Sequence, residues 1–406
     1  MKAYERLVKY AAYPTASDES KDCTPSTPEQ LVFAKALKEE METLGVTDIT
    51  LDENGYLFGT IASNIEKDVP VVGFIAHMDV VDDVPFENVQ THLVENYDGG
   101  DIVVNSEKNI VISAEQFPFI KKYKGKTLLF SDGTTLIGAD DKAGVAEIMC
   151  MAEYFQAHPE VKHGKIMIGF TPDEEIGRGA DKFDVKRFGA DFAFTCDGAF
   201  FGEVSYENFN AAALKVTVNG KNIHPGESKG KMKNSLLIGM EYNALLPVNE
   251  RPEFTEGYEG FFHLTDMSGD VECTVLNYII RDHDAKLLEM KKQTAKKAAD
   301  FLNFKYGEGT VEVDIKDSYR NMAEKIKGHE NIIDIAFKAI KNVGGEPFSE
   351  PIRGGTDGAT LSFMGLVCPN LGTGSHNHHG TLEFAVVEDM QKCVDSIIEI
   401  AKLVCE

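Results

Sequence analysis

The sequence predicts an α/β protein with a mixed, largely parallel sheet flanked by helices, plus an inserted α+β domain. Continuous apolar runs such as residues 69–76 are typical of strands buried on both faces. Helical segments separate such runs between residues 30 and 200, which is the pattern of a layered α/β domain. The length of 406 residues exceeds what one hydrophobic core usually fills, so we expect two domains.

The composition excludes several classes of protein. Lys and Arg number 41 against 66 Asp and Glu, a formal charge of −25, which argues against nucleic acid as a partner because counterion release needs clustered cations. No apolar run approaches membrane-spanning length, and MKAYERLVKY predicts an amphipathic helix rather than a signal peptide. Seven cysteines without framework spacing favour free thiols in a reducing compartment. We therefore expect a cytoplasmic protein that binds neither nucleic acid nor membranes.

The elements begin with a helix and a hairpin. A helix is predicted over residues 27–45, with Thr27 as N-cap and Gln30 completing a capping box. Residues 49–61 alternate around an Asn-Gly turn at 54–55, as a β-hairpin does. The apolar patterns predict four further strands, at residues 69–76, 128–130, 166–170 and 192–195. Residues 82–125 are polar and irregular, with weak strand signals, and a mostly buried helix follows residue 144.

The pattern changes after about residue 207 and returns after residue 319. Residues 208–319 predict the order β-α-β-β-α-β, with strands at 211–218, 261–266, 271–280 and 311–315 and helices at 234–246 and 285–304. Helices at 330–342 and 387–404 then resume the α/β style. The sequence therefore predicts a discontinuous first domain, residues 1–207 and 320–406, which holds a second domain, residues 208–319.

Metal-binding side chains follow several predicted strands. These are His77, Asp79, Asp140, Glu175 and Asp197, and the segment 372–380 adds His376, His378 and His379. Singly, each has an ordinary explanation, such as a turn residue, a solvated loop, or a helix N-cap at Asp140 or Asp141. Jointly they indicate one site, because the residues outside the segment 372–380 all lie where a strand ends or a helix opens around one sheet. Imidazole and carboxylate without thiolate suits zinc, with cobalt and manganese as alternatives.

Three consecutive acids, Asp173, Glu174 and Glu175, follow one buried strand. One acid can bind a metal while its neighbour takes a proton from a metal-bound water. A carboxylate shared by two metals holds them about 3.5–4 Å apart, the spacing of two-metal hydrolases. Asp173 is interpreted as a solvated turn residue.

A resemblance to a known family rests on motifs spread along nearly the whole chain. The motifs are HMDVV, GADDKAGVAEIM, FTPDEEIG, TCDG, NIHPG, TEGYEGF, YIIRDHD, IRGGTDGA and HHG. Together they resemble the di-zinc aminopeptidases of the aminoacylase/carboxypeptidase superfamily, above all its tripeptide aminopeptidases. The resemblance implies two zinc ions per subunit.

The resemblance also implies roles for single residues of the first domain. One zinc would be held by His77, Asp140 and Asp197, with Asp140 as the bridge to a second zinc. Glu175 and His379 would complete the second zinc, with His378 as the alternative to His379. Asp79 would orient His77. Glu174 would be the general base and later the acid.

In the inserted domain the resemblance implies a lid that also joins two subunits into a homodimer. His224 would donate to the developing oxyanion, from its own or the partner subunit. Asn234 would support it or simply cap the next helix. Arg353, placed in the first domain, would clamp the carboxylate of a peptide or form a structural ion pair.

The expected function is a zinc-dependent aminopeptidase that releases the N-terminal residue from short peptides, chiefly tripeptides, by a metal-bound water that Glu174 activates. The alternatives on the same scaffold are a dipeptidase, an aminoacylase and a carboxypeptidase. A non-catalytic metal- or peptide-binding protein is a further alternative. Glu174 and Asp79 weigh against it, since neither is an expected metal ligand.

Overall fold

The computed structural model describes residues 1–405 as two compact units. Unit 1 comprises Met1–Tyr206, Glu324–Glu350 and the described residues from Thr356 onward. Unit 2 comprises Glu207–Ala323 and Pro351–Gly355. Across residues 1–405, no helix combines the length and apolar character that crossing a membrane requires.

A seven-stranded mixed sheet forms the centre of unit 1. Its strands, in spatial order, are β1 (Thr47–Leu51), β2 (Leu57–Ile61), β8 (Ile166–Thr171), β3 (Val72–His77), β9 (Phe192–Gly198), β15 (Asn370–Gly372) and β10 (Val204–Ser205). The four central strands, β8, β3, β9 and β15, are parallel, and the outer pairings are antiparallel. The predicted α/β fold with a mixed sheet flanked by helices is confirmed, and so is the hairpin of β1 and β2.

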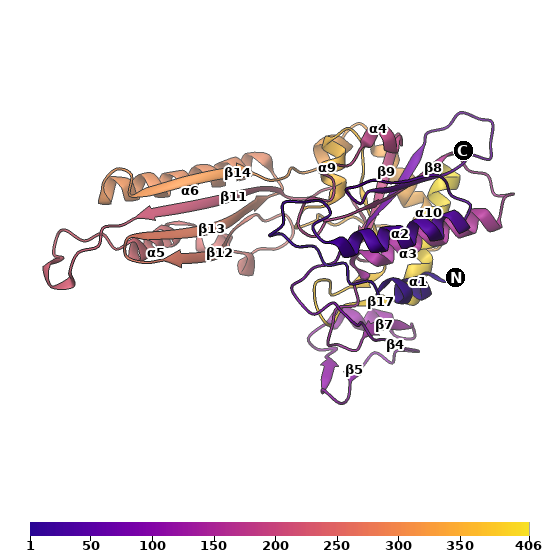
Figure 1. The fold of residues 1–406 in the computed structure, drawn as a ribbon, viewed down its shortest axis with the longest axis horizontal. Coiled ribbons are helices and arrows are strands. Elements are labelled where there is room, and N and C mark those ends of the chain that lie inside the picture. The colour runs from indigo at the N-terminus through magenta and orange to yellow at the C-terminus, as the bar shows by residue number, and fades with distance from the viewer. Residues whose placement is uncertain (406) are drawn as a thin grey trace. The chain divides into compact units, whose positions relative to one another are not determined.

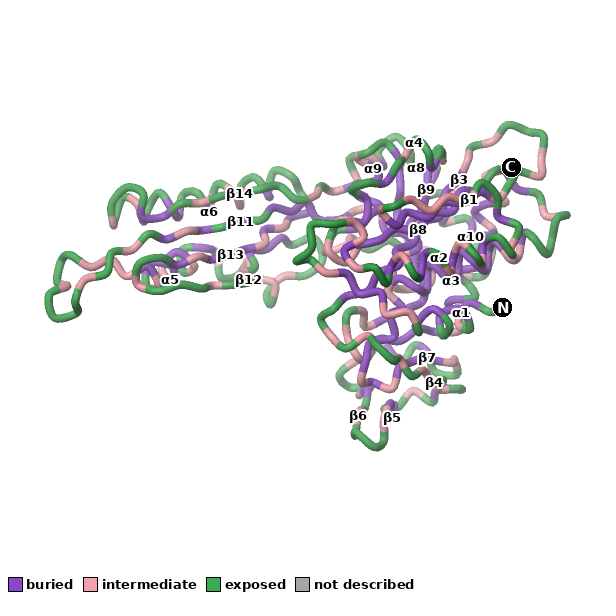
Figure 2. The backbone as a smooth tube through the Cα atoms, in the orientation of Figure 1, coloured by how far each residue is buried: buried purple, intermediate pink, exposed green. Residues whose placement is uncertain are grey.

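The central strands are buried on both faces because helices cover each side. Every residue of β3 and β8 is buried, as their continuous apolar sequences require. Helix α3 (Ala139–Ala157) packs against β3 and β9. On the other face, Phe188 of α4 (Val185–Phe188) and Leu361 of α9 (Asp357–Phe363) pack with Ile75 of β3. Figure 2 shows the buried backbone concentrated in these central strands.

The other helices of unit 1 surround α3 or flank the sheet. They are α1 (Ala3–Tyr10), α2 (Pro28–Thr43), α8 (Glu330–Asn342) and α10 (Val387–Leu403), with the short α7 (Ala323–Ile326) at the border with unit 2. Helix α10 packs on α3 and α8, α1 packs on α3, and α2 packs on β1 and β2.

Two smaller sheets complete unit 1. One has the order β16 (Ser375–His376), β17 (Phe384–Val386), β7 (Leu128–Ser131) and β4 (Thr91–Val94). The other is the hairpin of β5 (Ile102–Asn105) and β6 (Ile110–Ile112), followed by the 3₁₀ helix η1 (Pro118–Tyr123). Strand β4 was not predicted, because it is a half-exposed edge strand without an apolar alternation.

Unit 2 is a four-stranded antiparallel sheet with two helices. The strand order is β12 (Phe261–Gly269), β13 (Cys273–Asp282), β11 (Asn210–Asn219) and β14 (Val311–Asp317), and the helices are α5 (Ser235–Leu245) and α6 (Ala285–Tyr306). Burial alternates along β13, so that Leu276, Tyr278 and Ile280 face the core beneath both helices. Figure 1 shows α6 running along the strands of this unit. Three short 3₁₀ turns, η2 (Pro225–Glu227), η3 (Val248–Glu250) and η4 (Pro252–Phe254), lie in its loops.

Two local expectations were wrong. Helix α2 follows Thr27 as predicted, but no capping box forms: the Thr27 hydroxyl donates to the Ala16 carbonyl (2.7 Å), and Gln30 Nε2 donates to Asp173 (2.7 Å) and to the Thr27 hydroxyl (3.1 Å). Arg353 belongs to unit 2 rather than to the first domain. Its guanidinium donates to the carbonyls of Gly257 (2.7 Å) and Glu259 (3.0 Å), which tie the 351–355 segment to that unit.

Candidate metal centre

The predicted ligands meet at one edge of the central sheet. Strands β3, β8 and β9 are parallel, so their carboxyl ends lie at the same edge. His77 ends β3, Glu175 follows β8 and Asp197 lies near the end of β9. Asp140, at the start of α3, joins them because α3 packs on β3 and β9.

His77 faces two carboxylates with one ring nitrogen and Asp79 with the other. Its Nε2 lies 3.0 Å from Asp140 Oδ1 and 3.5 Å from Asp197 Oδ1. Its Nδ1 lies 3.1 Å from the Asp79 carbonyl oxygen and 3.3 Å from Asp79 Oδ1. Both ring nitrogens face acceptors, so with a metal ion on Nε2 the ring proton would lie on Nδ1 and be donated to Asp79. In that tautomer, Nε2 has a lone pair for the metal ion.

Asp140 and Asp141 have different partners. Asp141 is buried and accepts from two backbone amides, those of His77 (3.2 Å) and Gly144 (3.1 Å), so it acts as a cap at the start of α3. Asp140 turns its side chain to the histidines, with Oδ1 towards His77 and Oδ2 3.3 Å from His379 Nε2. Of the two aspartates, Asp140 therefore faces histidines with both carboxylate oxygens.

The three histidines of the C-terminal loop also have different partners. His376 is buried among aromatic rings and pairs with the Tyr123 hydroxyl (2.6 Å), and burial lowers its pKa to about 3. His378 Nε2 pairs with the Ser375 hydroxyl (2.9 Å), while its Nδ1 is 3.5 Å from Asp140 Oδ2. His379 lies nearest to the acids, with Nε2 3.0 Å from Glu175 Oε2.

The acidic turn after β8 is held by Asp79. Asp79 is fully buried, and its two carboxylate oxygens accept from the backbone amides of Glu174 (3.0 Å) and Glu175 (3.0 Å). The Glu175 carboxylate pairs with His379, whereas the Glu174 carboxylate makes no hydrogen bond to any residue from 1 to 405. The two neighbouring acids are therefore placed differently.

Asp173 was wrongly interpreted as a solvated turn residue. It is 0% exposed, and its carboxylate accepts from the Ser26 amide and hydroxyl and from the Gln30 side-chain amide. These donors replace the water that a solvated carboxylate would have.

The carboxylates of the centre perturb one another. Burial, together with Asp197, raises the pKa of Glu174 well above its ordinary value. Burial and Asp140 raise the pKa of Glu175 to about 7, although His379 opposes them. Burial would raise the pKa of Asp140, but His378, His379 and His77 hold it well below its ordinary value. The pKa of His379 is raised to about 11 by Asp140 and Glu175.

This donor set fits divalent metal ions. Two sets of three residues could each hold a metal ion, His77–Asp141–Asp197 and His77–Asp140–Glu175. Within each set, the ligand atoms lie within 4.8 Å of one another. Imidazole and carboxylate donors are those of zinc sites. Burial and neighbouring carboxylates raise the pKa values of Glu174 and Glu175, and a nearby cation would oppose both effects. Asp141 was not among the predicted ligands, and each of its two oxygens accepts from one backbone amide.

The sequence argument gave no role to two buried acids at the centre. Glu383 accepts from the amides of Gly138 (2.7 Å) and Asp140 (2.9 Å), and so holds the backbone of Asp140, the predicted bridge. Its place four residues after His379 was the only signal for it. Asp357 accepts from the Thr171 hydroxyl (2.9 Å) at the end of β8, and burial raises its pKa to about 7.

Three predicted substrate-binding residues lie in unit 2. His224 is exposed, and its Nδ1 accepts from the Gly226 amide (3.2 Å). Asn234 caps α5 through the Leu237 amide (3.3 Å), the simpler of its two interpretations. The guanidinium of Arg353 bonds Gly257, Glu259 and Thr255, so its neighbours are loop acceptors rather than an ion-pair partner.

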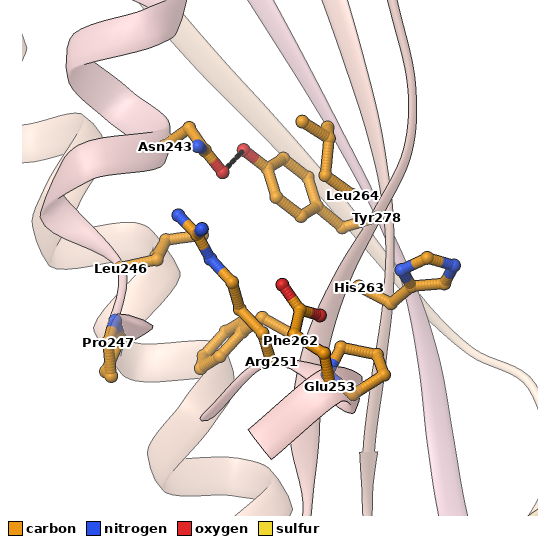
Figure 3. A pocket seen from close by; sticks show the side chains of 10 residues that line it. Asn243, Leu246, Pro247, Arg251, Glu253, Phe262, His263, Leu264 and Tyr278 are labelled. Atoms are coloured by element: carbon orange, nitrogen blue, oxygen red, sulfur yellow. Dashed lines mark hydrogen bonds between the residues drawn. The ribbon is translucent and has the colours of Figure 1, made fainter. Parts of the chain in front are cut away.

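Unit 2 also has a pocket of about 250 Å³ beside β12 and β13. Figure 3 shows Asn243, Tyr278 and Arg251 around it, with the Tyr278 hydroxyl donating to Asn243 (3.2 Å). The pocket includes none of the predicted site residues.

Comparison with known proteins assigns the class of protein. Residues 114–403 match peptidase family M20/M25/M40. The chain belongs to this family, and it is a hydrolase that acts as an exopeptidase.

Within the family, the sequence is similar to peptidase T. It is 53% identical to peptidase T of Caldanaerobacter subterraneus over 402 residues, 99% of this chain and 98% of that protein. It is 54% identical to peptidase T of Clostridium acetobutylicum over 402 residues, with the same coverage of both chains.

Solved structures share the fold. Aminopeptidase PepT from Bacillus cereus has a TM-score of 0.79 at 20% identity, covering 100% of this chain and 98% of that one. A tripeptidase from Staphylococcus aureus has a TM-score of 0.78 at 22% identity, covering 99% and 98%. A dinuclear metal-binding peptidase of family M20 from Bacillus subtilis has a TM-score of 0.66 at 15% identity, covering 99% and 97%.

Proposed function

We propose that this protein is a zinc-dependent aminopeptidase that releases the N-terminal residue from short peptides, chiefly tripeptides. The similarity to peptidase T, and the fold shared with an aminopeptidase and a tripeptidase, support the peptide substrate. A cytoplasmic location stays a prediction from the pattern of cysteines in the sequence.

One observation carries the mechanism, the different surroundings of Glu174 and Glu175. Glu175 pairs with His379 inside the ligand cluster, 3.0 Å apart. Glu174 comes from the same turn, yet within residues 1–405 its carboxylate has no hydrogen-bond partner. Glu174 is thus free to take a proton from water, whereas Glu175 is committed to the ligand cluster.

The donor atoms support two metal ions per subunit. His77, Asp140 and Asp197 would hold one, and Glu175 and His379 the other, with Asp140 between them. Zinc suits these donors best, and cobalt and manganese are alternatives. When bound, such ions supply Lewis-acid catalysis that polarises the scissile carbonyl and makes water more acidic.

The residues of the chain then move the proton. Glu174 accepts a proton from the water whose oxygen attacks the first peptide carbonyl carbon. When the C–N bond breaks, Glu174 returns that proton to the leaving nitrogen, and the products are a free amino acid and the shortened peptide. Asp79 keeps His77 oriented through Nδ1 and holds the backbone of Glu174. His224, as a donor to the developing oxyanion, stays a prediction, as do substrate roles for Asn234 and Arg353.

Replacing Glu174 with Gln tests this mechanism. The variant keeps the size of the side chain but cannot accept the proton, so kcat for a tripeptide should fall about 10²–10⁴-fold. Metal analysis should still find two ions per chain, because Glu174 is not a ligand. Turnover that survives in this variant would refute the role of Glu174.

A peptide panel separates the alternatives on the same scaffold. Di-, tri- and tetrapeptides should be compared, each with a free and an acetylated N-terminus. An aminopeptidase for tripeptides cleaves the free tripeptide best and releases its first residue. Preference for acetylated members would indicate an aminoacylase, preference for dipeptides a dipeptidase, and release of the last residue a carboxypeptidase. Metal binding without any cleavage would favour the non-catalytic alternative.

A further inference from the structure

Asp173 lies at the start of the acidic turn and is held from a distant part of the chain. Its Oδ2 accepts from the Ser26 amide (2.8 Å). Its Oδ1 accepts from the Ser26 hydroxyl (2.6 Å) and from Gln30 Nε2 (2.7 Å). Ser26 and Gln30 are buried at the start of α2, 147 and 143 residues before Asp173. Among residues 1–405 no cation pairs with this fully buried carboxylate, which these donors stabilise instead.

The backbone of the turn is held as firmly as this side chain. The amide of Asp173 donates to Gln30 Oε1 (3.1 Å). The next two amides donate to the two oxygens of Asp79, at 3.0 Å each. Three consecutive amides, those of residues 173, 174 and 175, are therefore bound by side chains from outside the turn.

The conformation of Asp173 explains why the turn needs this support. Its φ of +56° lies in the left-handed region, which residues other than glycine rarely adopt. Such a conformation persists only where the surroundings impose it. The direction of the next two side chains depends on it, because Glu175 must reach His379 while Glu174 stays clear of the ligand cluster.

We propose that Ser26, Gln30 and Asp173 form a positioning cluster that sets the directions of the Glu174 and Glu175 carboxylates. The cluster acts through the backbone of the turn, and its three members bond one another and the turn rather than the predicted ligands. The inference rests on the proposed function, in which Glu174 moves the proton and Glu175 binds a metal.

Exchanging the two polar groups of the cluster tests the proposal. Asp173→Asn places an amide group next to the donors of Ser26 and Gln30. Gln30→Glu places a second carboxylate next to that of Asp173. Gln30→Glu therefore loses the hydrogen bond between the two positions. Asp173→Asn has one acceptor oxygen in place of two, so it loses either that bond or the bond from the Ser26 amide. The double variant, Asp173→Asn with Gln30→Glu, restores it with donor and acceptor exchanged, so it should rescue the function that the single variants lose.

Two readouts follow the direction of the carboxylates. For a tripeptide substrate, each single variant should lower kcat about 10- to 100-fold, because a displacement of about 1 Å costs that much, and should change KM by less than about 2-fold. The double variant should recover most of the loss in kcat. In Co²⁺-substituted protein, the visible absorption of the single variants should differ from that of the wild type, and the double variant should restore it.

Glu40→Gln is the matched control. Glu40 lies on the same helix and pairs with the buried Arg6 (2.9 Å), so its loss lowers Tm without touching the turn. The kcat and Co²⁺ spectrum of the Glu40→Gln variant should equal those of the wild type. An equal loss of kcat in this control, unchanged single variants, or a double variant no better than the single ones would overturn the proposal.

Two further arms keep the test decisive. If Asp173→Asn does not fold, Ser26→Ala removes the hydroxyl that donates to Asp173 (2.6 Å) and accepts from the Asp18 amide (2.9 Å), and it should lower kcat a few-fold with an altered Co²⁺ spectrum. An unaltered spectrum and kcat in this milder variant would count against the cluster. If the wild type cleaves no tripeptide, the proposed function fails, while the Co²⁺ spectra still decide whether the cluster positions Glu175.

Discussion

At the scale of single residues, Asp140 is the member of the ligand cluster that faces both His77 and His379. Its Oδ1 lies 3.0 Å from His77 Nε2, and its Oδ2 lies 3.3 Å from His379 Nε2. Glu383 holds its backbone amide at 2.9 Å, so the position of the carboxylate is set from behind. Asp141, the next residue, has the same side chain but only backbone partners within this cluster.

Metal analysis of two variants separates a bridge from a ligand of one metal. Asp140→Asn should lose most of both ions after dialysis, because each proposed site loses a carboxylate oxygen. His379→Ala should retain about one ion per chain, because His77, Asp140 and Asp197 remain. Atomic absorption on dialysed protein measures both. Equal metal content in the two variants would contradict the assignment of Asp140 as the bridge.

The residue scale also shows where the sequence argument failed. His77, Asp140, Glu175 and Asp197 follow strands or open a helix, so their pattern predicted that they would meet. Asp173 lies in the same motif as Glu175, and nothing local distinguishes a buried acid from a solvated one. Its burial depends on Ser26, which is 147 residues away in the sequence.

At the scale of elements, α3 is a helix buried on nearly every side, and it carries a buried acid. Glu147 is 1% exposed, and both of its carboxyl oxygens lack a hydrogen-bond partner among residues 1–405. Burial raises its pKa well above the ordinary value. The folded state therefore keeps Glu147 protonated at pH values at which the unfolded chain has released the proton.

Glu147 makes stability depend on pH. Because its pKa is higher in the folded state, its contribution is fully present below the unfolded pKa and is lost as pH rises towards the folded pKa. Glu147→Gln removes this dependence. The free energy of unfolding of the variant minus that of the wild type should rise with pH above the unfolded pKa, by at most about 1.4 kcal/mol per pH unit.

Urea denaturation at pH 5, 6, 7 and 8 measures this difference. The slope with pH is the quantity to compare, because the Gln amide has its own cost of burial at every pH. A difference that is constant from pH 5 to 8 would show that Glu147 is not protonated in the folded state.

The elements themselves were largely predictable. The hairpin of β1 and β2, the buried strands β3, β8 and β9, and the element order of unit 2 follow from apolar periodicity and turn residues. Strand β4 was missed, since a half-exposed edge strand carries little of that signal. The capping box at Gln30 was wrong, because a side chain that can cap its own helix bonded a distant acid instead.

At the scale of the whole molecule, both helices of unit 2 carry large apolar side chains that are exposed. Leu237 and Met240 of α5 and Phe301 and Phe304 of α6 are exposed, Phe304 by 90%. Exposed apolar groups of this size are common where a second chain packs. They support the predicted homodimer through the inserted domain, a prediction that rests on the family resemblance.

Light scattering tests the dimer. The wild type should elute with the mass of two chains, and Phe304→Glu should shift the mass towards one chain, because it buries a charge in the proposed interface. Lys297→Glu, a change of charge on the same helix, is a control for the effect of added negative charge. A wild type with the mass of one chain would contradict the prediction.

By itself, the sequence determined the α/β fold, the order of elements and the set of side chains that meet at the sheet edge. These properties depend on local periodicity and on the rule that parallel strands end together. Only the tertiary structure gave Asp140 and Asp141 different partners, set the three C-terminal histidines apart, moved Arg353 to unit 2 and buried Asp173. The physical reason is that each of these depends on which partner a polar side chain finds across the fold. Hydrogen bonds between distant segments leave no periodic trace in the sequence.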